Sequence, residues 1–392
     1  MRILFFTLIK ISSFKEKSIY ADMVNEFIKI GHSVDYLFPS EENFNLNVNN
    51  NSITSIQLGL KFQKTKDFFR KFLSYKLIEK KVSRKIKESN LVYDLLIIST
   101  PSIFQLKIIK IFKKKYPDSR TLLLLKDIFP DNAIDLNLFV NLPFNKHLIQ
   151  YFHLIEENLY KSVDFIGCMN QSNINYISNK HPYLKTKLFV SHNSIKSYPL
   201  ELQEIDYTFP KNSLKFVFLG NIGLPQNISS FEVFIKRTKP NIFFLIIGSG
   251  TKVNFLKKLE KDYPQKIKVI NHLSNRQLID SYLNIMDAGL VLLNPNFKVP
   301  NYPSKLLTYL NAKLPIIAFT DKHNEISDVI KSYNLGYWSD FNDLDKCLSI
   351  LNNFSFEKST SKFSEILSIY SIENQVNNIL KVINDDSIER GL

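Results

Sequence analysis

Short apolar runs alternate with segments of helical periodicity through the second half of the chain. The runs carry aromatic and β-branched side chains, which is typical of strands buried on both faces. We expect strands at 216–219, 242–247, 267–270, 288–293 and 315–319, with helices at 228–237, 253–262, 275–284 and 305–312. This regular alternation predicts an α/β domain with a parallel sheet covered by helices on both faces.

The first half of the chain shows the same alternation. A strand at 1–9, a helix at Ser18–Ile30 and a strand at Val34–Phe38 form a βαβ opening, with Gly31 placed as the helix C-cap. The loop Ile11–Lys17 contains no glycine, so it lacks the dinucleotide fingerprint, which argues against an NAD enzyme. Residues 40–60 are polar and are interpreted as a loop or edge. Further strands are expected at 95–99, 121–125, 163–168 and 188–191, and helices at 105–115 and 148–161.

The length of 392 residues predicts two domains, each able to bury its own core. We place a first Rossmann-like domain at 1–194 and a linker with Pro199 and Pro210 at 195–213. A second Rossmann-like domain follows at 214–370, with a helical tail at 371–392. Two cysteines, Cys168 and Cys347, lack metal or disulfide-framework spacing, and no run of 18 apolar residues occurs. Both observations favour a cytoplasmic protein.

Much of the formal charge of +14 lies in one stretch. Residues 61–88 contain eleven Lys and Arg against three acidic residues, a net +8, with aromatic and aliphatic residues at roughly helical spacing. A basic amphipathic helix of this kind is typical of a peripheral contact with an anionic membrane surface. A core helix with a solvated, Lys-rich outer face explains the same pattern, and the sequence leaves both interpretations open.

Three turns carry the candidate chemistry. Gly220 and Gly223 follow the strand at 216–219, and Gly248-Ser249-Gly250 follows the next strand. Glycine lets a backbone approach a ligand closely, and N–H groups at a helix start attract phosphate. Pro303-Ser304-Lys305 opens the helix at 305–312, with Ser304 expected to cap it. We expect the three turns to meet at the carboxyl edge of the second sheet, where Lys305 either binds a diphosphate or reaches solvent.

In the first domain, charged residues follow the buried strand at 121–125. Lys126 and Asp127 therefore lie at the carboxyl edge of that sheet, where open α/β sheets bind ligands. Asp127 either orients a substrate or caps the next helix. His153 and His192 have no partner at ligand spacing and are interpreted as structural.

In combination, these motifs resemble the GT-B glycosyltransferases of glycosyltransferase family 4. The similarity extends to the branch that transfers N-acetylated amino sugars in bacterial surface polysaccharide assembly, including O-antigen and capsule. It is carried by Phe218-Leu219-Gly220-Asn221-Ile222-Gly223 with Gln226, Ile247–Gly250, Pro303-Ser304-Lys305 with Tyr309 and Pro315, and in the first half by Gly31-His32, Asp127–Asp131 and Asn193.

The resemblance implies two Rossmann-like domains facing across a cleft, with the donor nucleotide sugar bound mainly by the second. The turn containing Gly220, Asn221, Gly223 and Gln226, together with Gly248, Gly250, Ser304 and Lys305, would lie near the donor diphosphate. The base would lie near Asn271–Leu273, which includes His272, and Thr308 would face the ribose. Lys126, Asp127 and Lys305 are the implied catalytic residues.

The chain departs from the family pattern at four positions. Many members have Arg and Lys where this chain has Asn221 and Gln226, although the amino-sugar branch often keeps Asn and Gln. The Glu pair that grips the sugar and ribose is replaced by Pro300 and Thr308. A neutral hydroxyl is about half as strong an acceptor as a carboxylate, so donor affinity is expected to be weaker.

The implied reaction is glycosyl transfer with retention from a nucleotide diphosphate sugar, a UDP-sugar favoured, to a saccharide on a polyprenyl diphosphate. We expect no metal and no further cofactor, because no Asp-x-Asp motif lies in a suitable loop. Backbone N–H groups and Lys305 would stabilise the leaving diphosphate. Residues 61–88 would hold the enzyme on the inner membrane face, without nucleic acid as a partner. The alternatives are a sugar-nucleotide epimerase, a non-catalytic basic nucleic-acid or membrane binder, and an inactive partner subunit.

Overall fold

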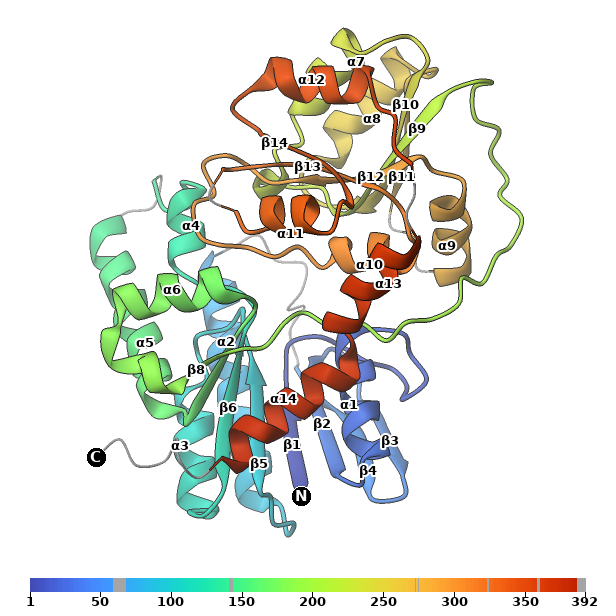
Figure 1. Ribbon diagram of the computed structural model, residues 1–392. Helices are drawn as coiled ribbons and strands as arrows, with labels where there is room; N and C mark the ends of the chain where they lie inside the picture. The colour runs from blue at the N-terminus through green and yellow to red at the C-terminus, as the bar shows by residue number, and fades with distance from the viewer. Residues whose placement is uncertain are drawn as a thin grey trace. The chain divides into compact units, whose positions relative to one another are not determined.

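The computed structural model describes residues 1–58, 68–140, 144–271, 273, 275–322, 324–357 and 360–385. The chain divides into two compact units, Met1–Lys196 with Ser371–Leu392, and Ser197–Tyr370. Each unit contains one mainly parallel sheet with helices packed against it (Figure 1).

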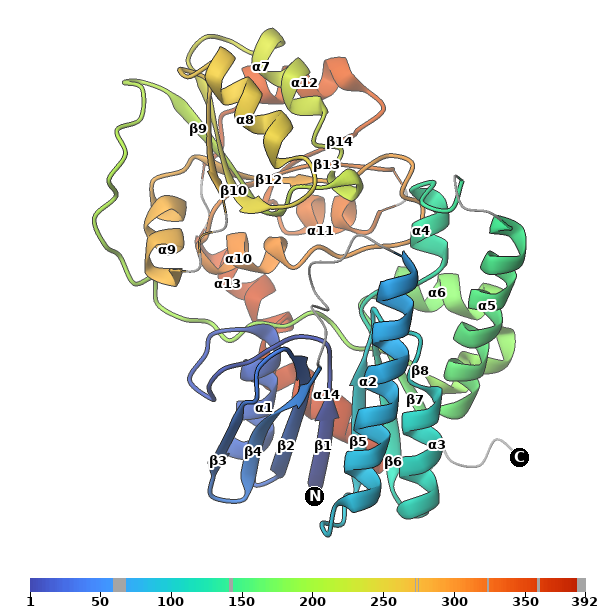
Figure 2. The ribbon, with the colours of Figure 1, turned by 180° about the vertical axis from the view of Figure 1, so that it is seen from behind.

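The first unit contains an eight-stranded sheet in the order β3-β4-β2-β1-β5-β6-β7-β8, parallel except for the β3–β4 pair. Helices α1 and α14 cover one face, and α2 and α3 lie on the other (Figures 1 and 2). The strands are β1 (Arg2–Phe6), β2 (Ser33–Ser40), β3 (Asn45–Val48), β4 (Asn51–Gln57), β5 (Leu95–Ser99), β6 (Arg120–Leu125), β7 (Phe165–Cys168) and β8 (Leu188–Val190). The helices are α1 (Ile19–Lys29), α2 (Phe68–Glu88), α3 (Leu106–Lys115), α4 (Asp131–Asp135), α5 (Asn145–Ser162), α6 (Gln171–Lys180), the 3₁₀ helix η1 (Pro182–Lys187) and α14 (Ile372–Asn384).

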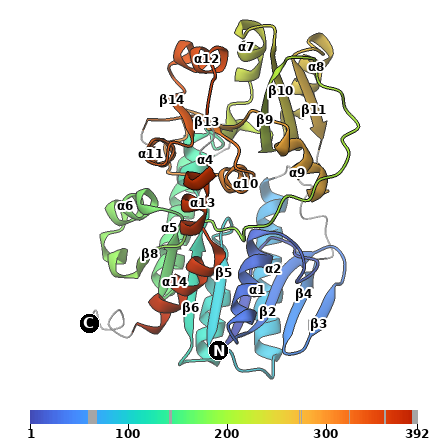
Figure 3. The same cartoon turned by 45° about the vertical axis from the view of Figure 1, so that its right-hand side comes forward.

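The second unit contains a fully parallel six-stranded sheet in the order β11-β10-β9-β12-β13-β14. Helices α7, α8 and α12 cover one face, and α9, α10 and α11 lie on the other (Figure 3). The strands are β9 (Leu214–Asn221), β10 (Ile242–Ser249), β11 (Ile267–Asn271), β12 (Ala288–Leu292), β13 (Ile316–Thr320) and β14 (Gly336–Asp340). The helices are η2 (Leu224–Gln226), α7 (Ser230–Arg237), α8 (Val253–Asp262), α9 (Arg276–Asn284), α10 (Lys305–Asn311), α11 (Ile326–Ser332), α12 (Leu344–Asn352) and α13 (Thr360–Ile369).

Local capping fixes the ends of several helices. Ser18 caps α1 by accepting a hydrogen bond from the N–H of Ala21, and Asn275 caps α9 through the N–H of Leu278. Gly31 adopts φ +92° after α1, and the N–H groups of Gly31 and His32 donate to Ile28 and Phe27. This is the Schellman arrangement, which confirms the glycine C-cap expected at the end of this helix.

The unit boundaries differ from the four expected segments. Ile372, Val376, Ile379 and Ile383 of α14 pack into the core of the first unit, so the tail belongs to that unit. Residues 197–213 belong to the second unit, where Tyr207 and Phe209 contact Phe243 with ring centroids 6.2 Å and 5.4 Å apart. Aromatic burial thus fastens the expected linker to the second sheet.

Helix α2 buries its apolar face within the first unit. Ile78, Val82 and Ile86 are buried, and the ring of Tyr75 stacks on Phe104 at 5.8 Å. The core-helix interpretation therefore describes residues 68–88, whereas residues 61–67 lie outside the described part of the chain. Within that described part, no helix is both long enough and apolar enough to cross a membrane.

Candidate functional site

The carboxyl end of β9 forms the base of the candidate site in the second unit. The strand ends in Gly220, which adopts φ +110°, and Asn221, and the chain then turns through Gly223 into η2. The side-chain amide of Asn221 donates to Gln226 Oε1 at 3.4 Å. Two residues predicted to contact the donor are thus connected to each other across the turn.

The second glycine turn packs directly on the first. A Cβ added at Gly248 would lie 1.8 Å from the carbonyl oxygen of Gly220, and one added at Gly250 would lie 2.3 Å from that of Ile222. Gly250 also adopts φ +156°. These two glycines therefore allow close approach of two backbones, and no ligand is needed to explain them.

Lys305 reaches the end of β9 from the first turn of α10. Its Nζ lies 3.7 Å from the centre of the Phe218 ring, and its Cε lies 3.6 Å from the position of a Cβ added at Gly220. Lys305 is half-buried, and burial lowers the pKa of its ammonium to about 7. Among the described residues no carboxylate lies within ion-pair distance of it. Lys305 is therefore partly desolvated at the end of β9, while part of its side chain stays in contact with solvent.

The N-terminus of α10 has unused hydrogen-bond donors. Ser304 has φ −59° and ψ −24° and its side chain makes no capping bond, so the expected Ser304 cap is wrong. A capping side chain requires extended backbone at this position, whereas Ser304 is already helical. Within the described chain, four backbone N–H groups have no hydrogen-bond acceptor. They belong to Ser304 and Lys305 at the helix start and to Gly223 and Leu224 in the turn after β9. Such groups favour an anion.

Tyr309 fixes α10 against the sheet. Its buried hydroxyl accepts from the N–H of Leu219 at 3.0 Å and lies 3.2 Å from the carbonyl oxygen of Val217. Its ring covers Gly289, where an added Cβ would lie 2.6 Å from a ring atom. The contribution of Gly289 was missed by the sequence analysis. Its signal is a glycine inside a buried strand, which indicates close approach of another group.

One further predicted donor contact lies on α10, and another falls outside the described residues. Thr308 is half-buried on α10, three residues after Lys305, and therefore shares its helix face. His272 lies outside the described residues, directly after β11 ends at Asn271. The structure thus brings together Gly220, Asn221, Gly223, Gln226, Gly248, Gly250, Ser304 and Lys305 at the carboxyl edge of the second sheet.

Lys126 lies at the carboxyl edge of the first sheet and already has acceptors. Its Nζ donates to the carbonyl oxygens of Ser191 at 3.0 Å and His192 at 3.2 Å, and burial lowers its pKa to about 7. The ammonium therefore joins the end of β6 to the end of β8. These two hydrogen bonds account for the position of Lys126, and no catalytic role is needed to explain it.

Asp127 is held by the same edge. Its N–H donates to Thr100 Oγ1 at 2.8 Å, and its carboxylate accepts from the side chain of Asn132. Helix α4 has Pro130 at its N-cap, so Asp127 does not cap the next helix and that alternative is wrong. The carboxylate remains at the sheet edge, in a position suited to orienting a hydroxyl group.

A charged network fixes α4 beyond Asp127. Asp131 accepts from Lys180 at 2.7 Å and Tyr176 at 2.9 Å, while fully buried Glu156 accepts from Tyr160 at 2.9 Å. His153 lies within 3.3 Å of Glu156, and the His192 ring lies 2.9 Å from the Met169 carbonyl oxygen. Both histidines have the contacts expected of structural residues. In the described chain no group of three metal-ligating side chains occurs.

Comparison with known proteins agrees with this arrangement. Residues 201–359 match the family model described as Glycosyl transferases group 1. The match covers most of the second unit, and it contains all predicted donor-binding residues. Lys126 and Asp127 lie outside it.

The relatives extend the similarity to the whole fold. The probable glycosyltransferase WbjE of Pseudomonas aeruginosa is 25% identical over 224 residues, 55% of this chain and 54% of that protein. The alignment thus spans about half the length of the curated relative. The OtsA apo structure has a TM-score of 0.70 at 12% identity, covering 98% of this chain and 99% of that one. The apo lipopolysaccharide outer core galactosyltransferase WaaB has a TM-score of 0.60 at 13% identity, covering 98% and 99%. The predicted GT-B fold of two parallel-sheet domains is confirmed.

Proposed function

We propose that this chain is a glycosyltransferase that binds a nucleoside diphosphate sugar at the carboxyl edge of the second sheet. The observation that carries the proposal is Lys305, a partly desolvated cation beside Gly220. Within the described residues it has no carboxylate partner, and N–H groups of two turns at the same sheet edge have no acceptor. A diphosphate would accept from these donors and restore the charge on the lysine. The match over residues 201–359 supports the same ligand class.

The leaving diphosphate is stabilised by this group of donors. Negative charge develops on it as the glycosidic bond breaks, and preorganised N–H groups with an ammonium are suited to meet that charge. We propose UDP as the nucleotide, since a structurally similar trehalose-6-phosphate protein from E. coli has been solved with UDP-2-fluoro glucose. An N-acetylated amino sugar as the transferred group and retention of configuration rest on the resemblance through Asn221 and Gln226.

The test is a thermal-shift panel with UDP, GDP, CDP and dTDP on the wild type, Lys305→Met and Lys331→Met. Lys331 is the matched control, because its ammonium also lies over an aromatic ring of the second unit, Trp338, at 4.6 Å. A nucleotide at a hundred times its dissociation constant adds about 2.7 kcal/mol of stability. We expect the UDP shift to be kept in Lys331→Met and lost in Lys305→Met, since a charged hydrogen bond contributes about 1.5–3 kcal/mol.

Absence of a shift with all four nucleotides would contradict the proposed donor site. An equal UDP shift in Lys305→Met would leave a nucleotide site that does not use this lysine. With UDP binding established, release of UDP from UDP-N-acetylglucosamine and UDP-glucose in the presence of saccharide acceptors identifies the transferred sugar.

We propose that the acceptor is a lipid-linked saccharide and that the first unit contacts an anionic membrane surface electrostatically. Helices α2 and α3 together carry thirteen Lys and Arg against two Glu, a net +11. Lys80, Lys87, Lys110 and Lys114 are exposed on these helices. Each basic side chain near an anionic membrane contributes about 1 kcal/mol.

Replacing these four lysines with Glu is expected to abolish sedimentation with phosphatidylglycerol vesicles. Sedimentation with neutral phosphatidylcholine vesicles serves as the control. Unchanged sedimentation of the fourfold variant would remove these helices from the membrane contact. Binding to single-stranded RNA but to neither vesicle would favour the nucleic-acid alternative.

A further inference from the structure

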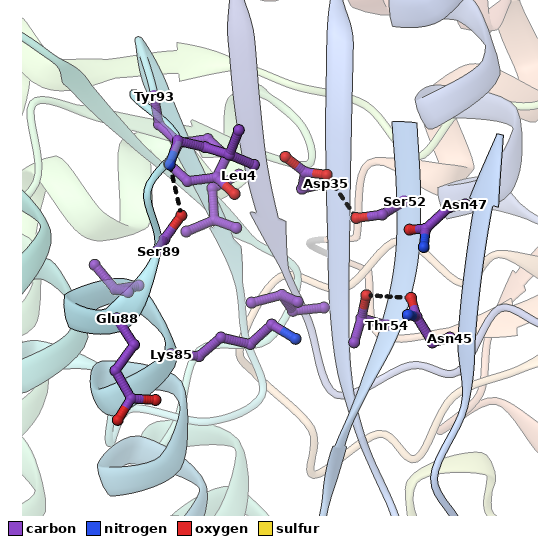
Figure 4. A pocket seen from close by; sticks show the side chains of 13 residues that line it. Leu4, Asp35, Asn45, Asn47, Ser52, Thr54, Lys85, Glu88, Ser89 and Tyr93 are labelled. Carbon is purple, nitrogen blue, oxygen red and sulfur yellow. Dashed lines mark hydrogen bonds between the residues drawn. The ribbon is translucent and has the colours of Figure 1, made fainter. Parts of the chain in front are cut away.

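A polar pocket lies on the sheet of the first unit, beside the C-terminal end of α2. Its cavity of about 340 Å³ is bounded by β1, β2, β3 and β4 on the floor and by α2 and the segment before β5 on the wall (Figure 4). Leu91 and Tyr93 line it and precede β5, so the pocket lies toward the amino ends of the strands. Asp127 follows β6 at the opposite edge of the same sheet.

The floor of the pocket is polar and includes the antiparallel pair β3–β4 at the edge of the sheet. Asp35, Ser52, Thr54, Asn45 and Asn47 face the cavity, whereas the alternate residues Tyr36, Ile53 and Leu46 pack toward α1. Antiparallel pairs can expose one face, and Asn45 and Asn47 are exposed here. Here the register of β3 on β4 pairs Asn45 with Thr54 and Asn47 with Ser52, so amides and hydroxyls form one continuous surface.

Hydrogen bonding within the floor leaves several groups unused. Asp35 is satisfied, because Arg2 donates to its Oδ2 at 2.9 Å and Ser52 donates to its Oδ1 at 2.5 Å. Thr54 donates to Asn45 Oδ1 at 3.2 Å. The Nδ2 group of Asn45 and the whole side-chain amide of Asn47 make no hydrogen bond to any described residue.

Lys85 supplies the unpaired charge. Its side chain points from α2 across the floor, and in the described chain no carboxylate pairs with it (Figure 4). Glu88, which also lines the pocket, is paired with Arg84 at 2.7 Å. Lys85 remains solvent-exposed, yet the surrounding protein lowers the pKa of its ammonium, and the charge of Asp35 opposes that shift. An anion would satisfy this cation.

Apolar side chains also line the pocket. Leu37, Ile86 and Leu91 border the cavity beside the amides and hydroxyls. Small-molecule sites combine apolar walls with a few placed polar groups, and their volumes begin near 300 Å³. Acidic sugars combine the three features that this pocket would bind. Their hydroxyl groups match the polar floor, their C–H groups match the apolar side chains, and their single negative charge matches Lys85.

We propose that this pocket is a second ligand site, which binds an acidic saccharide of one or two residues through Lys85, Asn45 and Asn47. The ligand's carboxylate or phosphate pairs with the lysine, and its hydroxyls bond to the amides. The site belongs to the first unit and uses none of the residues proposed to bind the donor nucleotide.

The test uses saturation-transfer NMR on the full chain with glucuronate, glucose 1-phosphate, glucose and inorganic phosphate as probes. All titrations contain saturating UDP, so that the donor site is occupied. We expect both acidic sugars to bind the wild type and Lys85→Met to weaken them about tenfold, as expected for one charged hydrogen bond. The control is Lys185→Met, an exposed lysine of the first unit that does not line the pocket.

A second variant tests the floor independently of charge. Asn47→Ala is expected to weaken both acidic sugars about threefold to tenfold while leaving inorganic phosphate unchanged. The proposal is overturned if Lys85→Met binds the acidic sugars as tightly as the wild type. It is also overturned if inorganic phosphate binds as tightly as glucose 1-phosphate, since the sugar would then contribute nothing. The UDP thermal shift of Lys85→Met should equal that of the wild type, which keeps this result separate from the donor-site test.

Discussion

Lys126 and Lys305 occupy corresponding places in the two units. Each lies at the carboxyl edge of a parallel sheet, and burial lowers the pKa of each to about 7. Their surroundings differ, because Lys126 donates to the carbonyl oxygens of Ser191 and His192. Lys305 faces the Phe218 ring, with no carboxylate partner in the described chain. A lowered pKa alone therefore does not distinguish a structural lysine from a binding one, whereas the hydrogen-bond acceptors do.

The largest expected effect comes from the glycine that supports the Lys305 region. In Gly248→Ala the new methyl group lies 1.8 Å from the Gly220 carbonyl oxygen, so the backbone must move. We expect a loss of about 3 kcal/mol of unfolding free energy together with loss of UDP binding. Urea denaturation and the UDP thermal shift measure the two effects.

The corresponding change in the first unit is Gly167→Ala, where the added Cβ lies 2.6 Å from Ser191 Cβ. It should disturb the segment that accepts from Lys126 and lower stability, but leave UDP binding intact. If Gly167→Ala removed UDP binding as completely as Gly248→Ala, the separate roles of the two edges would be refuted.

An intermediate effect is expected when each lysine is replaced by Met. Lys126→Met leaves two carbonyl oxygens without their donor, so the free energy of unfolding should fall by about 1–3 kcal/mol. Lys305→Met removes a partly desolvated charge that makes no hydrogen bond within the described chain, so stability should stay level or rise. Urea titration of both variants measures the difference, and a larger loss in Lys305→Met would reverse our assignment.

The smallest expected effect is the pH dependence of UDP affinity. Free Lys305 has a pKa of about 7, and a bound diphosphate raises it because the charged form is then favoured. Above pH 7 binding therefore takes up a proton, and affinity falls by up to about tenfold per pH unit. Calorimetry in two buffers of different ionisation enthalpy measures this proton uptake.

Lys305→Arg provides the control for this dependence, since Arg stays protonated and its affinity should not fall above pH 7. In Lys126→Met, UDP affinity should fall above pH 7 as steeply as in the wild type. Loss of this pH dependence in Lys305→Arg alone then identifies Lys305 as the titrating group. If the slope persisted in Lys305→Arg, another group would be responsible.

The sequence by itself determined the alternation of strands and helices, because apolar runs and helical periodicity are local properties of the chain. It also placed Gly220, Gly248 and Lys305 at one sheet edge, since the carboxyl ends of parallel strands meet there. Residues 40–60, expected as a loop or edge, contain the edge hairpin β3–β4. The sequence did not place its two strands, because their alternation of Asn, Ser and Thr with apolar residues resembles a polar loop.

Only the tertiary structure decided what each of these groups contacts. Ser304 was expected to cap α10 but is itself helical. Gly248 and Gly250 were expected near the ligand, and their backbones pack directly against the turn at Gly220–Ile222. Lys126 directly follows β6 and Lys305 opens α10, and both lie at a carboxyl sheet edge, yet one meets the carbonyls that follow β8 and the other an aromatic ring. Such contacts join residues distant in sequence, and the packing of whole sheets sets them. Local patterns therefore predict where a side chain lies along its strand or helix, but its partners depend on the folded unit.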